Sequence, residues 1–143
     1  MSDWKARATE KRLAQYESIP TEWRLASIPE FTNAREWIRG SGILTSEELR
    51  ITEITNGRAL QSQLLSGSLS AEAVISSFAK RAAIAQQLIG CCTEMFFKAG
   101  IARAKELDKI FKETGKPVGP LHGFPISFKD NFMVKGVDTT IGM

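Results

Sequence analysis

Apolar side chains recur at helical spacing through most of the first 115 residues, and a loop rich in glycine and proline follows. Apolar residues three and four positions apart share one face of a helix, so this spacing predicts amphipathic helices. Two prolines and two glycines between Lys116 and Gly123 end the helical pattern. Polar and apolar residues then alternate from Pro125 to Asp130, with Ile126 and Phe128 on one face, which predicts a short strand. The order of elements indicates an α/β protein whose helices precede the first strand or strands of a sheet.

Helices are expected wherever apolar spacing agrees with residues that begin or end a helix. Thr45 and Glu48 have the spacing of a capping box, in which the hydroxyl and the carboxylate each accept a free backbone N–H. Ser70 is the expected N-cap of the longest helix, and Gly115 is expected to end the last one. Residues 91–97 are short and apolar and predict a brief strand or an extended entry. The expected helices span residues 3–17, 33–39, 46–50, 57–66, 71–88 and 98–114.

The composition, with 43% hydrophobic and 24% charged residues and a net charge of +3, is typical of an ordinary globular domain. Charges of both signs alternate along the chain, so no nucleic-acid partner is expected. The apolar runs are far shorter than a membrane span, and the polar start does not resemble a secretory signal, so no membrane association is expected. Cys91 and Cys92 are adjacent, which hardly allows disulfide geometry, and a reducing, cytoplasmic location follows.

The segment from Gly119 to Asn131 contains the residues that most suggest chemistry. It places Lys129 at the end of the short strand, where Ile126, Phe128 and Phe132 would surround it with apolar surface. Removal from water lowers the pKa of a lysine, which can then act as a neutral base. The residues alone favour the alternative, a solvent-facing lysine at a strand end, because most lysines are exposed.

The same segment resembles the N-terminal motif of the amidase signature family of serine hydrolases, and within it the fungal acetamidase-type amidases. In that family a Gly-Pro-Leu-His-Gly motif, a proline and a short apolar run lead to a catalytic lysine and an aspartate. Stretches at 44–53, 103–108 and 134–140 extend the resemblance over most of the chain. The motif positions matched here are Gly119, Pro120, Leu121, His122, Gly123, Pro125, Ile126, Lys129 and Asp130.

The resemblance implies a mixed sheet covered on both faces by helices, of which this chain would contain the N-terminal helices and the first strand or strands. We therefore expect an incomplete α/β fold. Residues 1–55 are expected to form an N-terminal helical extension, and residues 56–143 the N-terminal part of the amidase domain.

The family's activity implies hydrolysis of small carboxylic acid amides to carboxylate and ammonia by a Ser–cis-Ser–Lys triad, with Lys129 as its lysine. No metal or organic cofactor is implied, and the sequence identifies no substrate-binding residue. The family's two serines lie in a Gly/Ser-rich segment C-terminal of the lysine, but no serine follows Lys129 here. Upstream, Ser66 and Ser68 are interpreted as connector residues, and Ser76 and Ser77 as helix-surface residues.

With one of three triad residues, the chain is expected to be inactive alone. His122 is interpreted as a loop histidine that hydrogen-bonds the backbone, because the resembling family does not use it for proton transfer. In the complete enzyme we expect a small amide as substrate and leave open a homodimer. The alternative function is a non-catalytic helical interaction module derived from a truncated amidase paralogue.

Overall fold

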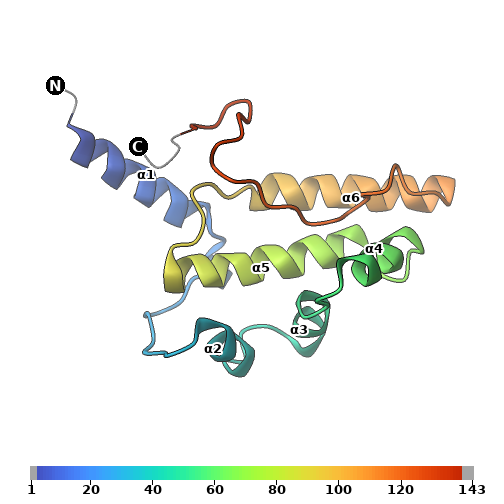
Figure 1. Ribbon diagram of the computed structural model, residues 1–143, viewed down its shortest axis with the longest axis horizontal. Coiled ribbons are helices and arrows are strands. Elements are labelled where there is room, and N and C mark those ends of the chain that lie inside the picture. Colours follow the sequence, from blue (N-terminus) through green and yellow to red (C-terminus); the bar gives the residue numbers. More distant parts are fainter. Residues whose placement is uncertain (1–2, 140–143) are drawn as a thin grey trace.

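The computed structural model describes residues 3–139, and its regular structure there is helical (Figure 1). Each helix expected from the sequence is present within two residues of its expected ends, and a short 3-10 turn, η1, is an addition. The elements are α1 (Trp4–Ser18), η1 (Thr21–Trp23), α2 (Ala34–Gly40), α3 (Ser46–Thr52), α4 (Gly57–Leu65), α5 (Ala71–Ile89) and α6 (Phe97–Thr114).

Side-chain caps begin the α-helices other than α6, and a glycine in the left-handed region ends each of the two long helices α5 and α6. The capping box of α3 is confirmed, since the Thr45 hydroxyl accepts from the Glu48 N–H at 3.2 Å and the Glu48 carboxylate accepts from the Thr45 N–H at 2.7 Å. Ser70 caps α5 by accepting from the Ala73 N–H at 3.0 Å. Gly115 ends α6 in the left-handed region, with φ of 67°.

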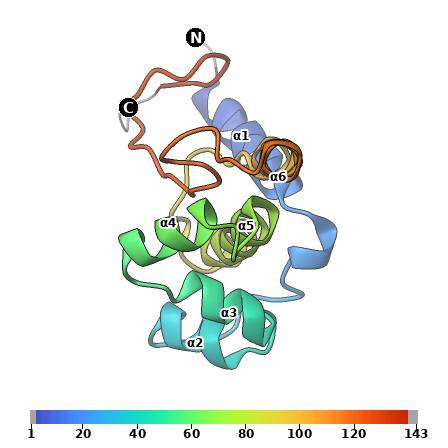
Figure 2. The same cartoon turned by 90° about the vertical axis from the view of Figure 1, so that its right-hand side faces the viewer.

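Helix α5 is the central element of the molecule. Helix α6 runs antiparallel along one side of it, and α2 and α3 lie on the other side (Figures 1 and 2). Ile84 on α5 packs with Ile38 of α2, and Val74 packs with Ile51 of α3 and Leu64 of α4. Helices α2, α3 and α4, which precede α5 in the chain, are thus fixed against this single long helix.

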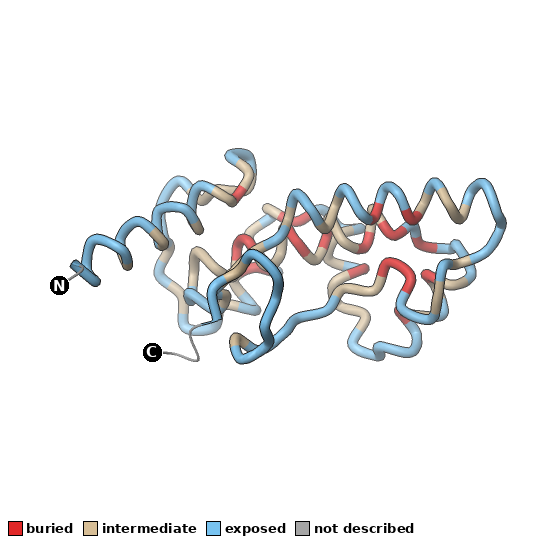
Figure 3. Tube along the Cα trace, turned by 90° about the horizontal axis from the view of Figure 1, so that it is seen from above, coloured by how far each residue is buried: buried red, intermediate tan, exposed pale blue. Residues whose placement is uncertain are grey.

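Contacts from several sides bury more of α5 than its sequence predicts. The spacing of its apolar residues predicts one stripe of Val74, Phe78, Ala82 and Ala85, of which Val74 is fully buried and the other three are half-buried. Ala79, Ala83 and Ile84 lie outside this stripe and are buried. Figure 3 shows buried positions along the facing sides of the long helices. A stripe calculated for one helix does not reveal how many neighbours that helix has.

Helix α1 extends away from this body and buries none of its residues (Figures 1 and 3). Two polar contacts connect it to the α5–α6 connection, residues 90–96. The Lys11 ammonium pairs with the Glu94 carboxylate, and the Gln15 amide donates to the Thr93 carbonyl. Lys11 also pairs with Asp138 at 3.0 Å.

Residues 3–139 contain no strand, so the sheet expected from the sequence is not observed. Pro125–Asp130, predicted to be a strand, is irregular. Residues 91–97, expected to form a brief strand or an extended entry, are irregular up to residue 96, and Phe97 begins α6. A strand requires a neighbour to pair its backbone N–H and C=O groups, and a short strand without one is unstable. Among the helices of the described region, none has both the length and the apolar character needed to cross a membrane.

Candidate functional site

The loop after α6 turns back along that helix (Figure 1). Its Gly123 lies against Leu64 of α4 and Ala71 of α5. A turn closes it, with the His122 N–H donating to the Gly119 carbonyl at 3.2 Å. The side-chain amide of Gln61 on α4 donates to the Pro120 carbonyl at 2.8 Å. The loop that leads to Lys129 is therefore fixed by contacts far apart in the sequence.

His122 is buried within this loop and organises it. Its ring nitrogen Nδ1 accepts from the backbone N–H of Val118 at 3.3 Å, and its ring lies against that of Phe111, with centroids 5.7 Å apart. Nδ1 acts as an acceptor, so in the neutral ring the proton is on Nε2. The interpretation of His122 as a loop histidine bonded to the backbone is confirmed.

Gly123 allows the loop to touch the start of α5. Its φ is +68°, which disfavours side chains, and a Cβ placed there would lie 2.5 Å from the Cβ of Ala71 and 3.1 Å from Leu64. No other residue type fits without displacing the loop or the helix. The motif glycine is thus explained by close packing against α5.

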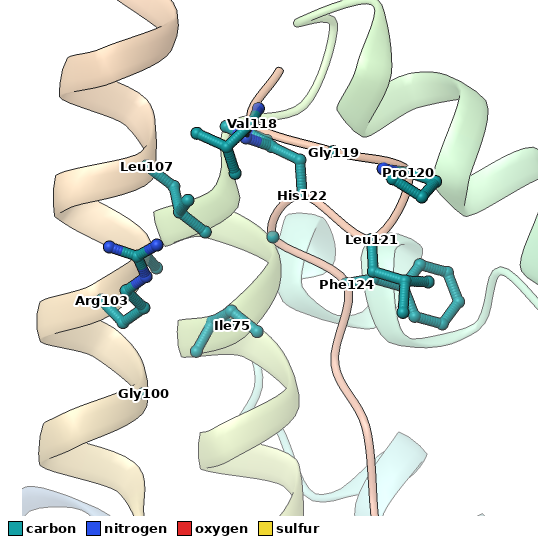
Figure 4. Close-up of a pocket in the computed structure, with 12 residues that line it drawn as sticks. Ile75, Gly100, Arg103, Leu107, Val118, Gly119, Pro120, Leu121, His122 and Phe124 are labelled. Atoms are coloured by element: carbon teal, nitrogen blue, oxygen red, sulfur yellow. Dashed lines mark hydrogen bonds between the residues drawn. The ribbon is translucent and has the colours of Figure 1, made fainter.

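An open pocket of about 490 Å³ lies between this loop and the α5–α6 pair. Ile75 of α5 and Leu107 of α6 face Val118 and Leu121 of the loop, with Arg103 at one side (Figure 4). The described lining residues include no serine, threonine or cysteine, so the pocket itself provides no nucleophile. It forms an apolar wall beside the segment that continues to Lys129.

Lys129 lies beyond the pocket, in the irregular segment, and its side chain is exposed. Within residues 3–139 its ammonium makes no hydrogen bond or ion pair, while its carbonyl accepts from the Phe132 N–H at 3.1 Å and closes a turn that includes Asp130. The expected apolar cover is absent in the described chain, since Phe128 and Phe132 stack on each other and are 65% and 55% exposed. The reason is that, within residues 3–139, no strand pairs with this segment and no helix lies over it.

The serines considered as nucleophiles are structural. Ser66 and Ser68 lie in the connection between α4 and α5, as expected, with their hydroxyls 3.1 Å apart. Ser77 corrects the sequence interpretation, because it is buried in α5 rather than on the helix surface, and its hydroxyl donates to the Ala73 carbonyl at 2.7 Å. In the described region, no group of three or more His, Cys, Asp or Glu side chains is placed to hold a metal ion.

Comparison with known proteins assigns the chain to a family. The family model for amidases matches residues 73–143, which include α5 from its third residue onward, α6 and the loop with Lys129. The acetamidase of Emericella nidulans is 43% identical over 97% of the chain, and that of Aspergillus oryzae is 41% identical over 96%. The chain belongs to the amidase family. The resemblance of its loop motif to the amidase signature is thereby confirmed.

The similarity to amidases extends to the structure. A fatty acid amide hydrolase superposes on 85% of this chain with a TM-score of 0.76 and 32% sequence identity, and the matched part is 22% of that enzyme. The chain spans 25% of the length of each of the two acetamidases. The helices described above are therefore an amidase-like arrangement that corresponds to about a quarter of those enzymes.

Two residues that hold this amidase segment together were not identified from the sequence. Asp108 of α6 accepts from the backbone N–H groups of Ala71 and Glu72, at 2.7 and 2.9 Å, and so caps α5 from outside. Gln61 of α4 holds the Pro120 carbonyl. Capping rules consider only residues near the same helix end, so neither contact leaves a local signal in the sequence.

Proposed function

We propose that this chain is the lysine-bearing part of an amidase that hydrolyses small carboxylic acid amides to carboxylate and ammonia. The observation that carries the proposal is the family match over residues 73–143, which includes the complete Gly119–Asp130 motif. Acetamidases among the relatives support a small amide as the substrate class, rather than a nucleic acid.

In the proposed mechanism, Lys129 is the base of a Ser–cis-Ser–Lys triad. The neutral amine accepts a proton from the bridging serine, which accepts one from the nucleophilic serine as that serine attacks the amide carbonyl. The lysine ammonium then returns a proton through the bridging serine to the amide nitrogen as the C–N bond breaks, so that ammonia leaves. Water hydrolyses the acyl-serine that remains. Another part of the amidase would supply both serines and the backbone N–H groups that stabilise the oxyanion. The 143-residue chain is accordingly inactive by itself.

A neutral lysine requires an environment that removes it from water. Ile126, Phe128 and Phe132 are all more than half exposed around Lys129, and they offer apolar surface for another part of the enzyme to cover. Cover that excludes water there would favour a neutral amine and make Lys129 available as a base. We propose that Pro125–Asp130 becomes a strand of the mixed sheet when that cover is present.

Other properties of the complete enzyme are part of the same proposal. The helical extension would end near residue 55, where the amidase domain would begin. A homodimer is a prediction without a described interface. A reducing, cytoplasmic compartment is supported by the free thiols of Cys91 and Cys92.

A chimera tests the proposal directly. These 143 residues replace the aligned segment of the Emericella nidulans acetamidase, and ammonia release from acetamide is followed for the chimera and for the chain alone. We expect turnover by the chimera and none by the chain. Turnover by the chain alone would contradict the division of the triad. A folded but inactive chimera, in which the segment still associates with the remaining enzyme, would favour the interaction module.

A further inference from the structure

Two thiols lie side by side in the connection between α5 and α6, apart from the loop that leads to Lys129. Cys91 and Cys92 are both free, their Sγ atoms are 3.8 Å apart, and Cys91 is exposed. Gly90 ends α5 in the left-handed region, and the Cys92 N–H donates to the Gln86 side-chain oxygen at 2.6 Å. The backbone that presents the thiols is therefore anchored to α5.

A second cavity, of about 440 Å³, opens beside this pair between α1 and the end of α5. Cys92 is part of its wall, together with Tyr16 and Ile19 and the side chains of Gln86 and Gln87. The cavity thus offers space with an aromatic and an aliphatic side chain directly next to a thiol. A group bound to the sulfurs could extend into it.

The separation of the sulfurs suits one bridging atom better than a disulfide. Adjacent Cα atoms are about 3.8 Å apart, shorter than the roughly 4.4 Å minimum usual for disulfides. By contrast, two sulfurs bound at about 2.3 Å to one tetrahedral atom lie about 3.8 Å apart. Around a trivalent pyramidal atom, with narrower angles, they lie about 3.4 Å apart. The Sγ separation here is 3.8 Å, so a small side-chain rotation suffices. The pair can accept a bridging atom without a change in the backbone.

The chemistry of the thiols restricts what this bridging atom can be. Structural zinc takes four ligands, and the described residues add no third His, Cys, Asp or Glu to the pair. Burial, with the neighbouring Cys91 thiol, raises the pKa of Cys92 to about 11, so this thiol stays protonated near neutral pH. The bound centre must therefore be satisfied by two sulfur ligands and must be able to react with the protonated Cys92 thiol.

We propose that Cys91 and Cys92 form a dithiol site for monosubstituted trivalent arsenicals, with the organic substituent in the cavity beside Tyr16. In the reaction of R–As=O with the pair, two As–S bonds form and the As=O bond breaks. The oxygen and both thiol protons leave as water. Arsenic stays trivalent and no electrons are transferred, so the reaction needs no oxidant or reductant.

Phenylarsine oxide is the probe, and intact-protein mass spectrometry is the readout. The chain contains two cysteines in all, so every arsenical bound through sulfur reports on this pair. We expect one arsenical per monomer that survives excess glutathione and is removed by dimercaptopropanol. Cys91→Ser and Cys92→Ser should each weaken retention by roughly 10²-fold, because binding through two linked contacts is lost. Alkylation of one of the two thiols in the unchanged chain should weaken retention of the arsenical to the same extent, without any substitution.

Two results would overturn the site. One is retention by either serine variant equal to that of the unchanged chain, and the other is an arsenical that links two chains instead of binding one. A comparison of phenyl with methyl arsenicals tests the cavity. Tyr16→Ala should weaken the phenyl compound severalfold and leave the methyl compound unchanged. Equal effects on both would contradict the placement of the substituent.

Discussion

Gly123 and Gly119 belong to the same loop but have different surroundings. A Cβ at Gly123 would lie 2.5 Å from Ala71, at a φ of +68°, whereas a Cβ at Gly119 would meet nothing within 4 Å. Gly123→Ala is therefore expected to destabilise the chain by about 1–3 kcal/mol, through backbone strain and overpacking. Gly119→Ala is the matched control and should have an effect near zero. Urea unfolding followed by circular dichroism measures both, and equal shifts in midpoint would refute the proposed contact.

Glu48 links stability to pH through two contacts. Burial raises the pKa of its carboxyl, but the hydrogen bond from the Thr45 N–H and the Lys80 ammonium, 3.0 Å away, outweigh burial and hold the pKa below 4.5. The folded state thus binds this proton less readily than the unfolded state. The resulting stability is present above about pH 4.5 and is lost as pH falls through the lower folded pKa.

Glu48→Gln removes this titration while the amide oxygen can still accept from the Thr45 N–H. We expect a loss of roughly 0.5–1 kcal/mol at neutral pH and a flatter fall in stability below about pH 4.5. Glu47→Gln is the control, because its pair with Arg50 is exposed and largely screened by water. Urea midpoints measured across this pH range test the difference. Parallel profiles for Glu48→Gln and the unchanged chain would show that the ion pair has no such role.

At the scale of elements, the start of α5 is held from two directions. Ser70, which directly precedes the helix, accepts a backbone N–H from its first turn. The carboxylate of Asp108, on α6, accepts the N–H groups of Ala71 and Glu72. Asp108→Ala should cost about 1–2 kcal/mol, since it leaves partly buried N–H groups unpaired and removes a negative charge from a helix N-terminus. Glu106→Ala, which breaks an exposed pair with Arg103, should cost less than about 0.5 kcal/mol. Thermal melts of both variants distinguish the two, and similar melting temperatures would contradict the external cap.

The ends of the helices are set by residues close in the sequence, whereas strand pairing and burial depend on distant residues. The Thr45 capping box, the Ser70 cap and the glycine at 115 are each determined within a few residues, so the sequence predicted the helices to within two positions. The strand expected at Pro125–Asp130 is not formed within residues 3–139, because strand formation needs partner strands and alternation alone is an insufficient signal. The burial of Ser77 likewise depends on the neighbours of α5, which the periodicity of one helix does not report.

At the scale of the whole molecule, apolar surface gathers where the chain approaches Lys129. Phe128, Phe132 and Met133 are 65%, 55% and 92% exposed, while the chain spans 25% of the length of each acetamidase relative. Physical reasoning on the residues alone favoured an exposed lysine, and Lys129 is exposed in the described chain. Its expected catalytic role came from the motif, because the groups that would bury it and share its proton are not among these residues.

The most direct test of the central claim compares Lys129 with His122 in the acetamidase chimera. Ammonia release from acetamide is measured for Lys129→Ala, Lys129→Arg and His122→Ala. Loss of the base should lower kcat by at least about 10²-fold. Arginine should not restore it, because a guanidinium stays protonated. His122→Ala should reduce kcat far less, since His122 holds the Val118 backbone. Near-normal turnover by Lys129→Ala, with His122→Ala inactive though folded, would contradict the account.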